Sequence, residues 1–457
     1  MTKPAIQKSR TVPPGPKGRL LVGNAFDFSR GNWLDFFIRC AREYGDVVSL
    51  RILNVPICLL THPDDIQNVL VKNASNFVKS RNYGALKPIL GNGLLTSEGV
   101  FWQKQRKLVQ PSFRHESIAA YAEVMVGTTE QMLSGWRDGQ TRDLHEEMVG
   151  LTLEIVAKSL FGADVSHETD KVSRAMHDIT NRLLAMPNLS FFLPKVFPLP
   201  SSVRLRRAVR ELDGIIYSMI RARRTESHRS HDLLQMLLEI QDEDGSHLTD
   251  EQLRDEMMTL FIAGHETTAI ALSWTWYLLA QHPEVEARLV DEVSSLLHGR
   301  VPWVSDLRSL PFTEMVLKET MRLYPPAWVV GREALNDFHT RGYRIPAGTN
   351  VLLVQWITQR DARFYTEAER FNPDRWKDDP IQSGRLPRYA YFPFGSGPRV
   401  CIGAGFAMME ATLLLATIAQ RFRLTLTSDQ PVEMLPSISL RPRNGIKMML
   451  HERCRAM

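Results

Sequence analysis

The residues with the clearest chemical potential lie in one short loop near the carboxyl end of the chain. Residues 394–403 read Phe-Gly-Ser-Gly-Pro-Arg-Val-Cys-Ile-Gly, and an apolar helical stretch follows them. A thiolate at the start of a helix is stabilised by backbone N–H groups and by the positive end of the helix dipole. Glycines let the backbone approach a flat ligand closely, and Arg399 can pair with a carboxylate on that ligand. Together these features suit Cys401 as the axial thiolate of a haem iron, where sulfur donates electron density that favours O–O cleavage.

The alternative for any cysteine is that it is a buried apolar side chain. We favour that alternative for Cys40, Cys58 and Cys454, which have no such surroundings. For Cys401 the motif hypothesis is stronger, because the pattern F-G-x-G-x-R-x-C fixes five residue types. Four scattered cysteines without a C-x-x-C pair also exclude a disulfide scaffold and are typical of a reducing compartment.

A second candidate for chemistry is the stretch 260–274, Leu-Phe-Ile-Ala-Gly-His-Glu-Thr-Thr-Ala-Ile-Ala-Leu-Ser-Trp. It is apolar on almost every side, so we expect a buried helix. Glu266 is costly there unless it is paired, protonated or in contact with water. Gly264 costs about 1 kcal/mol against alanine, so either a local opening for a small ligand or close helix packing must justify it. We interpret His265, which would face elsewhere on the helix, as structural or linked to solvent.

With these two motifs the sequence resembles the cytochrome P-450 superfamily of haem-thiolate monooxygenases, and the resemblance covers nearly the whole chain. It implies that Cys401 is the proximal ligand of the iron of haem b and that Arg399 contacts a haem propionate. It also implies that residues 263–267 cross the distal face of the haem. Thr267 then matches the alcohol that hydrogen-bonds to dioxygen, and Glu266 matches the acid of the proton relay. A structural carboxylate, capped or linked to water, is the alternative for Glu266.

One further pattern gains meaning only from that resemblance. Glu319 and Arg322 are spaced to pair on one helix face, but the same E-x-x-R spacing occurs at four other glutamates. The family joins such a pair to the arginine of an F-x-P-x-R segment, which here is Arg375. Trp376, at the end of that segment, departs mildly from the family's more usual Phe. This triad is structural in the family, where it fixes the loop under the haem.

Propionate contacts are implied elsewhere in the chain. Trp102 and Arg106 lie one helical turn apart, and both side chains are donors that could hold a propionate. Arg332 matches a third contact of this kind, with a surface arginine as the alternative. The cofactor-binding residues that the resemblance implies are Trp102, Arg106, Ala263, Gly264, Arg332, Phe394, which packs beside the ligand, Gly395, Arg399, Cys401 and Gly403.

A largely helical scaffold must position these residues. Strand patterns cover 46–53, 55–61 and 327–357, and more follow the last helix. There is no repeat and no linker between separate cores, so we expect one mostly α domain at 19–457, after a Pro-rich basic arm at 1–18. Its small β-sheets would lie near the N-terminal third and the C-terminal end. Helical patterns cover 33–44, 98–110, 116–135, 142–161, 168–184, 201–225, 248–281, 283–298, 311–323 and 404–422.

The composition is that of a globular protein. Apolar residues make up 44% of the 457 and charged residues 23%, which excludes a disordered chain. The net charge of +5 argues against nucleic acid as a partner. All of it lies in residues 1–60, so this part either favours an anionic membrane or an acidic partner, or is a solvated surface. The chain has neither a signal peptide nor a run of about 20 apolar residues, which predicts a soluble, cytoplasmic protein with at most peripheral membrane contact.

The substrate is expected to be apolar: a fatty acid, terpenoid, steroid or polyketide. The stretches 77–96 and 182–200 would line the distal cavity in this fold. Segment 182–200 is strongly apolar but broken by four prolines, so it forms a ligand entrance, touches a membrane or folds onto the core. Arg51 and Arg81 are candidates for anchoring a carboxylate. The candidate pocket residues are Phe77, Val78, Tyr83, Leu86, Phe261, Val329 and Ile438.

The combined prediction is a monooxygenase that inserts one oxygen atom of O2 into a C–H or C=C bond. The 56 residues after Cys401 leave no room for a flavin or iron–sulfur domain. We therefore expect electrons from a separate ferredoxin or flavodoxin and its reductase, with NAD(P)H used only indirectly, and a monomeric protein. Basic residues that would suit an acidic donor are Lys104, Lys107, Arg385 and Arg388.

Two alternatives remain open at this point. One is a haem-thiolate peroxygenase or isomerase that needs no redox partner, against which Glu266 and Thr267 argue. The other is a haem-based ligand-binding protein without catalysis. Turnover of an apolar compound with added reductase and ferredoxin would separate them from the monooxygenase.

Overall fold

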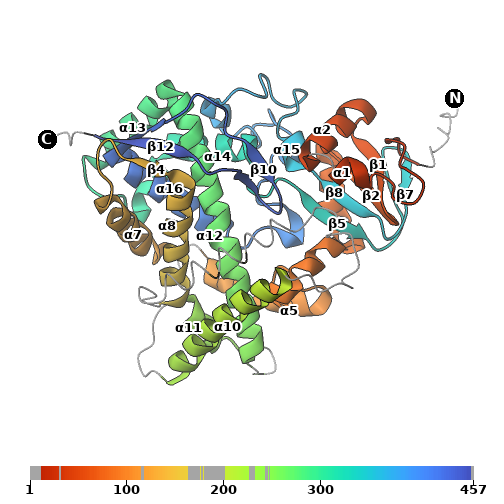
Figure 1. The fold of residues 1–457 in the computed structure, drawn as a ribbon, viewed down its shortest axis with the longest axis horizontal. Helices are drawn as coiled ribbons and strands as arrows, with labels where there is room; N and C mark the ends of the chain where they lie inside the picture. The colour runs from red at the N-terminus through yellow and green to blue at the C-terminus, as the bar shows by residue number, and fades with distance from the viewer. Residues whose placement is uncertain are drawn as a thin grey trace.

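The computed structural model describes most of the chain as helix, with strands in small separate sheets (Figure 1). The predicted fold class, mostly α with small β-sheets, is therefore confirmed. The division into an arm at 1–18 and a domain at 19–457 stays a prediction. Segment 182–200 and most of the predicted helix at 168–184 lie outside the described residues. Those residues are 12–29, 32–114, 118–162, 201–225, 232–241 and 247–453, together with Ala175, Ile179 and Gly245.

The helices follow the predicted ranges closely where local signals are strong. One begins after Asn32, whose side chain accepts a hydrogen bond from the Leu34 N–H at 3.0 Å, and it ends at Gly45 with a φ of 91°. The helices are α1 (Ala25–Ser29), α2 (Trp33–Tyr44), α3 (Pro63–Gln67), α4 (Lys87–Leu90), α5 (Gly99–Val109), α7 (Ala122–Ser134), α8 (Leu144–Phe161), α10 (Ser201–Thr225), α11 (Leu233–Glu239), α12 (Asp250–Gln281), α13 (Pro283–Leu297), α14 (Pro311–Leu323), α15 (Gln355–Thr358) and α16 (Ala404–Arg421).

The largest sheet has the strand order β1-β2-β8-β5-β3 and lies with α1 and α2 on one side of the molecule (Figure 1). Strands β2 and β8 run parallel, and the other neighbours run antiparallel. A second sheet has the order β4-β12-β9, and β10-β11 and β6-β7 form two hairpins. The strands are β1 (Val47–Ile52), β2 (Val55–Leu60), β3 (Phe77–Lys79), β4 (Thr141–Asp143), β5 (Val330–Ala334), β6 (Phe338–Thr340), β7 (Tyr343–Ile345), β8 (Asn350–Leu353), β9 (Phe422–Leu426), β10 (Met434–Pro436), β11 (Leu440–Pro442) and β12 (Lys447–Glu452).

Helix α12 runs through the middle of the molecule (Figure 1). It starts with a capping box, in which Thr249 and Gln252 each accept the other's backbone N–H. Most of its side chains are buried, and it packs against α8, α10, α14 and α16. This central position is the one expected for a helix that is apolar on almost every side. It places the stretch 260–274 in the core of the protein.

Helix α16 is the second buried helix and follows the cysteine loop directly. Glu410 lies fully buried in it, and burial raises the pKa of this carboxyl to about 8, so that it is protonated near neutral pH. A neutral acid is compatible with an apolar interior. In the part of the chain that the structure describes, no helix is long and apolar enough to cross a membrane.

Three element boundaries differ from the predictions. Within the predicted helix 116–135, helix α7 begins only at Ala122. The first residues of the predicted helix 142–161 belong instead to β4, which pairs with β12, and Asp143 then caps α8. The last residues of the predicted strand region 327–357 begin the short helix α15. The pairing of β4 joins segments about 300 residues apart, so a local hydrophobic pattern cannot reveal it.

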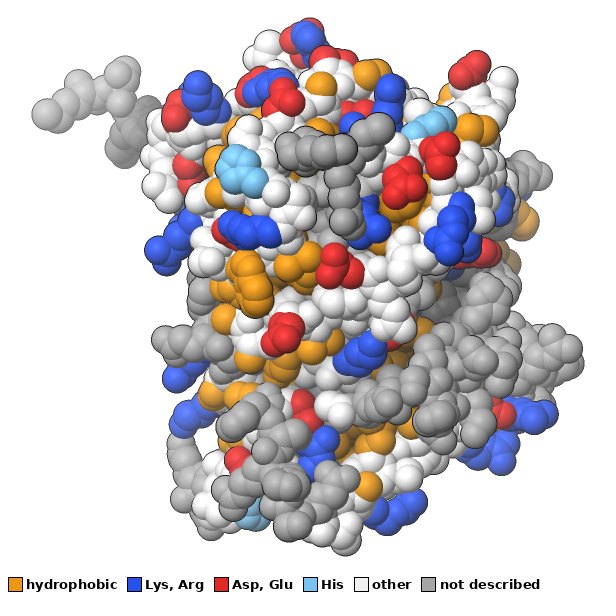
Figure 2. Space-filling model, turned by 90° about the vertical axis from the view of Figure 1, so that its left-hand side faces the viewer, with side chains coloured by type: hydrophobic (Ala, Val, Ile, Leu, Met, Phe, Trp, Pro, Cys, Tyr) orange, Lys and Arg blue, Asp and Glu red, His pale blue; other side chains and the backbone are white. Residues whose placement is uncertain are grey.

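Figure 2 shows one face of the molecule, on which basic and acidic side chains are interspersed with apolar ones. Neither sign of charge dominates this face. A surface for nucleic acid would instead gather Lys and Arg in a patch or stripe. The arrangement on this face agrees with the modest net charge of +5.

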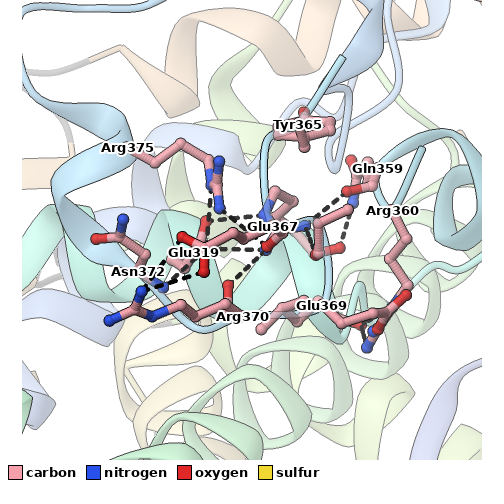
Figure 3. Close-up of polar contacts among 12 residues, drawn as sticks. Glu319, Gln359, Arg360, Tyr365, Glu367, Glu369, Arg370, Asn372 and Arg375 are labelled. Atoms are coloured by element: carbon pink, nitrogen blue, oxygen red, sulfur yellow. Dashed lines mark hydrogen bonds and ion pairs between the residues drawn. The ribbon is translucent and has the colours of Figure 1, made fainter. Parts of the chain in front are cut away.

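Glu319 lies in a network of polar contacts (Figure 3), and its ion pair with Arg322 is fully buried. Arg322 Nε and Nη2 each donate to one oxygen of the Glu319 carboxylate at 2.9 Å, and neither side chain has exposed surface. Arg375 Nε donates to the same carboxylate at 3.3 Å, so the structure brings the three predicted residues together. Arg322 also donates to three backbone carbonyls, those of Gln359, Ala368 and Arg370.

Trp376, the departure from the family's usual residue, belongs to this network. Its indole N–H donates to Glu319 Oε2 at 2.9 Å. Gln359 links the network onward, because its side chain donates to carbonyls at the end of α14 and accepts the Phe392 N–H at 3.1 Å. The network thus joins α14 to the chain just before residues 394–403.

We predict that removing Glu319 destabilises the protein strongly. Glu319→Ala leaves Arg322 and Arg375 without their buried partner, which costs roughly 3–5 kcal/mol of unfolding free energy. Trp376→Phe removes a single donor to the carboxylate and should cost about 1.5–3 kcal/mol. Urea unfolding curves of the purified variants measure both changes.

Glu367→Ala is the matched control for this prediction. Glu367 and Arg370 have the same i,i+3 spacing and lie 3.2 Å apart, but both are exposed. Losing such a surface pair should change the free energy of unfolding by at most about 1 kcal/mol. Equal destabilisation by the buried and the exposed substitution would contradict the role assigned to Glu319.

Candidate active site

The cysteine loop, residues 394–403, is closed by its own backbone and held by α5. The Cys401 N–H donates to the Phe394 carbonyl at 2.9 Å, which brings the two ends of the motif together. From α5, Arg106 Nη1 donates to the Val400 carbonyl at 2.8 Å. The sulfur-bearing residue is therefore fixed both by its own loop and by a neighbouring helix.

Two glycines of the loop have conformations that other residues rarely adopt. Gly395 and Gly397 have φ values of 69° and 70°. At Gly397 a Cβ would also lie 1.9 Å from the Leu70 carbonyl oxygen, so no side chain fits there. Gly403 then serves as the N-cap residue of α16. The glycines of the motif thus shape the loop and let it pack against the neighbouring chain.

The Cys401 thiol differs from the other cysteines in its surroundings. Its side chain is exposed, and the surrounding protein nevertheless desolvates the sulfur enough to raise its pKa. The Gly403 N–H, and then the charges of Arg106 and Lys79, lower that pKa. Cys40 and Cys58 are buried, and burial raises the pKa of Cys40 to about 12. Of these three described cysteines, Cys401 combines access with donors that stabilise a thiolate.

A cluster of basic side chains lies beside the cysteine loop. Lys79 on β3 and Arg332 on β5 are register partners across two antiparallel strands. Arg399 stacks on the Trp102 ring, 3.7 Å from its centroid, and pairs with Glu98. The cluster consists of Lys79, Arg106, Arg332 and Arg399.

The cluster holds more positive charge than the protein itself compensates. Burial lowers the pKa of Lys79 well below its usual value, and the charges of Arg332 and Arg399 lower it further against the opposing Glu98. Burial likewise lowers the pKa of Arg399, to about 10. The single carboxylate of Glu98 does not balance these four basic side chains, of which Arg332 is buried and the others are half-buried, so an anionic ligand would stabilise their charged forms. Haem carries two carboxylates and takes a thiolate ligand, so it fits this set of donors.

Sequence reasoning missed Lys79. The residue lies in a three-residue strand with no motif around it, and only the pairing of β3 with β5 places it next to Arg332. The structure does bring the predicted Trp102, Arg106 and Arg399 together near Cys401. A pattern search by local spacing has no signal for a residue of this kind.

Three successive carbonyls of α12 accept a side-chain hydroxyl. The donors Thr267, Thr268 and Thr152 bind the carbonyls of Ala263, Gly264 and His265 at 2.8, 3.3 and 2.9 Å. Such extra hydrogen bonds compete with the helical ladder. A Cβ on Gly264 would lie 3.3 Å from Val156 Cγ2 of α8, so the two helices pack closely at this position, as the second of the two expectations has it.

One side of α12 is accessible in the middle of this otherwise buried helix. Ala263 is exposed and Thr267 is half-buried, although the residues that follow are buried. His265 faces the interior, and its Nδ1 lies 2.8 Å from the Phe261 carbonyl. Burial lowers the pKa of this imidazole. The arrangement fits the structural interpretation of His265 and leaves Thr267 on the side that a ligand can reach.

Glu266 has hydrogen-bonding partners, as we expect for a carboxylate on a largely buried helix. Its Oε1 accepts hydrogen bonds from Ser439 Oγ at 2.8 Å and from Arg441 Nη2 at 2.9 Å. Ser439 immediately precedes β11, and Arg441 lies within it. Sequence reasoning missed both donors, because they lie more than 170 residues further along the chain.

The candidate pocket residues fall in different places. Leu86 and Phe261 belong to one buried cluster, and Tyr83 packs against it. Phe77 instead packs edge-on against Phe338, with 5.0 Å between ring centroids, in a cluster at the largest sheet. The structure thus brings together three of the seven. The others are Val78, half-buried on β3, Val329, which packs on a third cluster, and Ile438, which is 41% exposed.

The two arginines considered as carboxylate anchors already have partners. Arg81 forms two hydrogen bonds with the Glu333 carboxylate, both at 2.9 Å. Arg51 donates to the carbonyls of Leu53 and Arg19. These contacts give neither arginine an evident role in binding a substrate.

A depression of about 430 Å³ lies along α5 and the turn that follows it. Its walls contain three basic residues close together, one of which, Arg106, also reaches the cysteine loop. The lining residues are Trp102, Gln103, Arg106, Lys107, Gln110, Pro111 and Arg114. The surface next to the cysteine loop is therefore concave and basic.

Comparison with known proteins agrees with this geometry. Residues 13–449 match the profile of the cytochrome P-450 family. The chain is 34% identical over 413 residues to pentalenene oxygenase of Streptomyces avermitilis, covering 90% of this chain and 91% of that protein. It is 35% identical over 446 residues to cyclooctatin synthase of Streptomyces melanosporofaciens, covering 96% and 95%. The crystal structure of the cytochrome P450DA heme domain matches with a TM-score of 0.88 at 26% identity, over 98% of this chain and 99% of that one.

We predict that Cys401 supplies the iron ligand. The reduced holoprotein with carbon monoxide should show the red-shifted Soret band typical of a thiolate ligand, and Cys401→His should abolish that band. Absorption spectra measure the outcome. Cys40→Ser and Cys58→Ser, which change buried thiols elsewhere, should keep the band. A histidine-type spectrum from correctly folded, unsubstituted protein would show that another residue binds the iron.

We also predict that Lys79 strengthens haem binding. Lys79→Met removes one cation of the cluster, and losing a charge-assisted hydrogen bond of about 1.5–3 kcal/mol should speed haem loss about tenfold or more. Transfer of haem to apomyoglobin measures that rate. Lys87→Met is the control, because Lys87 is exposed and outside the cluster. Similar rates of haem loss from both variants would argue against a role for Lys79.

Proposed function

Because the chain belongs to the cytochrome P-450 family and is a monooxygenase of that family, we propose that its substrate is a terpenoid. Two relatives support this class, since pentalenene oxygenase and cyclooctatin synthase are terpenoid oxygenases that match nine-tenths or more of the chain. The apolar cluster that contains Leu86 and Phe261, with Tyr83 against it, suits a hydrocarbon guest next to α12. The relatives favour a terpenoid over the fatty acids, steroids and polyketides that an apolar pocket would equally admit.

In this proposal Cys401 holds haem b through its sulfur, and the basic cluster binds the two haem carboxylates. Bound haem would supply the activation of O2, by which one oxygen atom enters a C–H or C=C bond and the other leaves as water, with two electrons from the redox partner and two protons. Burial raises the pKa of Cys401, and the Gly403 N–H and the charges of Arg106 and Lys79 oppose that rise and favour the thiolate form. These residues thereby keep the sulfur available to the iron. They also hold the cofactor in one orientation.

In this proposal Glu266 and Thr267 form the relay that delivers protons to the distal side of the haem. The Thr267 hydroxyl donates to the Ala263 carbonyl at 2.8 Å, which orients its oxygen on the accessible side of α12. In the part of the chain that the structure describes, Ser439 and Arg441 both donate to Oε1 of Glu266, and in this proposal Oε2 is the oxygen that exchanges protons with water. The surrounding helices keep bulk water away, so that protons arrive through these two side chains.

Electrons come from a separate redox partner. We propose an acidic ferredoxin or flavodoxin whose reductase oxidises NAD(P)H. The basic depression along α5 supports this, because it is concave and adjoins the cysteine loop. A cytoplasmic location and a monomeric state are further parts of the proposal.

The substrate class is tested with a panel of cyclic terpene hydrocarbons and alcohols beside fatty acids and steroids. A terpene should shift the Soret band of the holoenzyme at a concentration at least about tenfold lower than any other compound. With a surrogate ferredoxin, its reductase and labelled O2, the product should gain one labelled oxygen atom. Tightest binding by a fatty acid or steroid would overturn the substrate class. An unlabelled or isomeric product would favour the peroxygenase or isomerase, and no product at all a binding protein.

The catalytic control in the same assay is Thr267→Ala. Product per NAD(P)H should fall about tenfold while peroxide release rises and substrate affinity stays the same. Thr268→Ala is the matched variant, because Thr268 has the same type of hydrogen bond to α12 but is buried. Product per NAD(P)H should stay close to that of the unsubstituted enzyme in Thr268→Ala. An unchanged yield in Thr267→Ala would remove that residue from its role.

A further inference from the structure

The stretch 92–98 connects α12 with the basic cluster beside the cysteine loop. Near its start, two backbone N–H groups donate to the side chains of Asp255 and Glu256 on α12, at 2.6 and 3.1 Å. At its end lies Glu98, which is the N-cap residue of α5. The backbone that carries Glu98 is therefore held both by the central helix and by α5.

Glu98 contacts the basic cluster through both oxygens of its carboxylate. Oε1 accepts the backbone N–H of Lys79 at 2.8 Å, and Oε2 accepts a hydrogen bond from Arg399 Nη2. Arg399 also donates to the Ser97 carbonyl at 3.0 Å and stacks on the Trp102 ring. Among these three contacts of Arg399, the one with Glu98 is the one that brings a negative charge.

The charge of Glu98 also acts on more of the cluster than its direct partner. Burial lowers the pKa of three of the basic side chains, and the charge of Glu98 opposes that change in each of them. These three are Lys79, Arg332 and Arg399. The Glu98 side chain is 35% exposed, so solvent screens part of its charge but not all of it.

The balance of charge beside the haem site has a consequence for the iron. With the two haem carboxylates bound, the four basic side chains would face three carboxylates, of which Glu98 is one. One electron from the redox partner reduces the ferric iron to the ferrous form. Positive surroundings favour that electron and a negative charge opposes it. Removing the charge of Glu98 should therefore make the iron easier to reduce.

We propose that Glu98 sets the reduction potential of the bound haem iron. It is a positioning residue: it holds Arg399 and adds a negative charge beside it, which makes the iron harder to reduce and limits electron uptake from the redox partner. This inference rests on the haem binding proposed above for Cys401 and the basic cluster.

The test is a potentiometric titration of the substrate-free holoprotein at one pH, followed by absorption, for Glu98→Gln and the unsubstituted protein. Glutamine keeps the shape and still accepts the Lys79 N–H, but it has no charge. The equilibrium constant for one-electron reduction should rise about threefold or more, which raises the potential by about 28 mV or more. The reduced carbonyl complex of Glu98→Gln should keep the Soret band of a thiolate ligand.

Two further variants separate the charge at this position from geometry and from net charge. Glu98→Asp keeps the charge on a shorter side chain, and its potential should stay close to that of the unsubstituted protein. Glu333→Gln removes a carboxylate that follows Arg332 on β5 but pairs with Arg81 at 2.9 Å, outside the cluster. Its potential should move clearly less than that of Glu98→Gln.

Several outcomes would overturn the proposal. They are an unchanged potential in haem-loaded Glu98→Gln, an equal shift in Glu333→Gln, and an equal shift in Glu98→Asp, which would make geometry the cause. Glu98→Ala replaces Glu98→Gln if that variant holds no haem. If neither binds haem, Glu98 has a structural role and the proposal fails. Unsubstituted protein that binds no haem would overturn the proposed function itself, and this inference with it.

Discussion

The buried ion pair between Glu319 and Arg322 is the constraint on which the cysteine loop and its surroundings depend. Taking two charges out of water costs several kcal/mol for each ion, so the pair persists only if its other hydrogen-bonding atoms find partners. Arg375 and Trp376 satisfy the carboxylate, while three backbone carbonyls satisfy the guanidinium. These contacts hold the chain between 359 and 376 in place. Gln359 then connects it to the segment before the cysteine loop, because its side chain accepts the Phe392 N–H.

Two groups of buried charge on the candidate site follow opposite principles. The cluster around Lys79 and Arg399 has an excess of cations over the single carboxylate of Glu98, which suits lasting capture of a dianionic cofactor. The pair Glu266–Arg441 is balanced within the protein, because the one carboxylate faces one guanidinium at 2.9 Å. The first arrangement calls for a bound anion, and the second does not.

The sequence was informative about the site wherever the required groups lie within a few residues of one another. The motif around Cys401 and the stretch around Thr267 are of this kind, since one loop and one helix carry their chemistry. Gly264 shows the limit of such reasoning: its cost in a helix was evident, but only the structure shows that Val156 of α8 packs closely against this position. Trp376 shows a second limit. It departs from the residue usual in the family, and only the structure shows that its indole N–H donates to Glu319.

The sequence by itself determined most of the described helices and indicated which side chains could be reactive, because helical periodicity and short motifs act over three to eight residues. It could not assign partners to charges that lie far apart along the chain. The tertiary structure decided that Lys79 stands opposite Arg332 and that Arg441 holds Glu266. These pairings follow from strand register and from the packing of a hairpin on a helix. Neither pairing can be recognised from a short stretch of sequence, because contacts throughout the fold stabilise it.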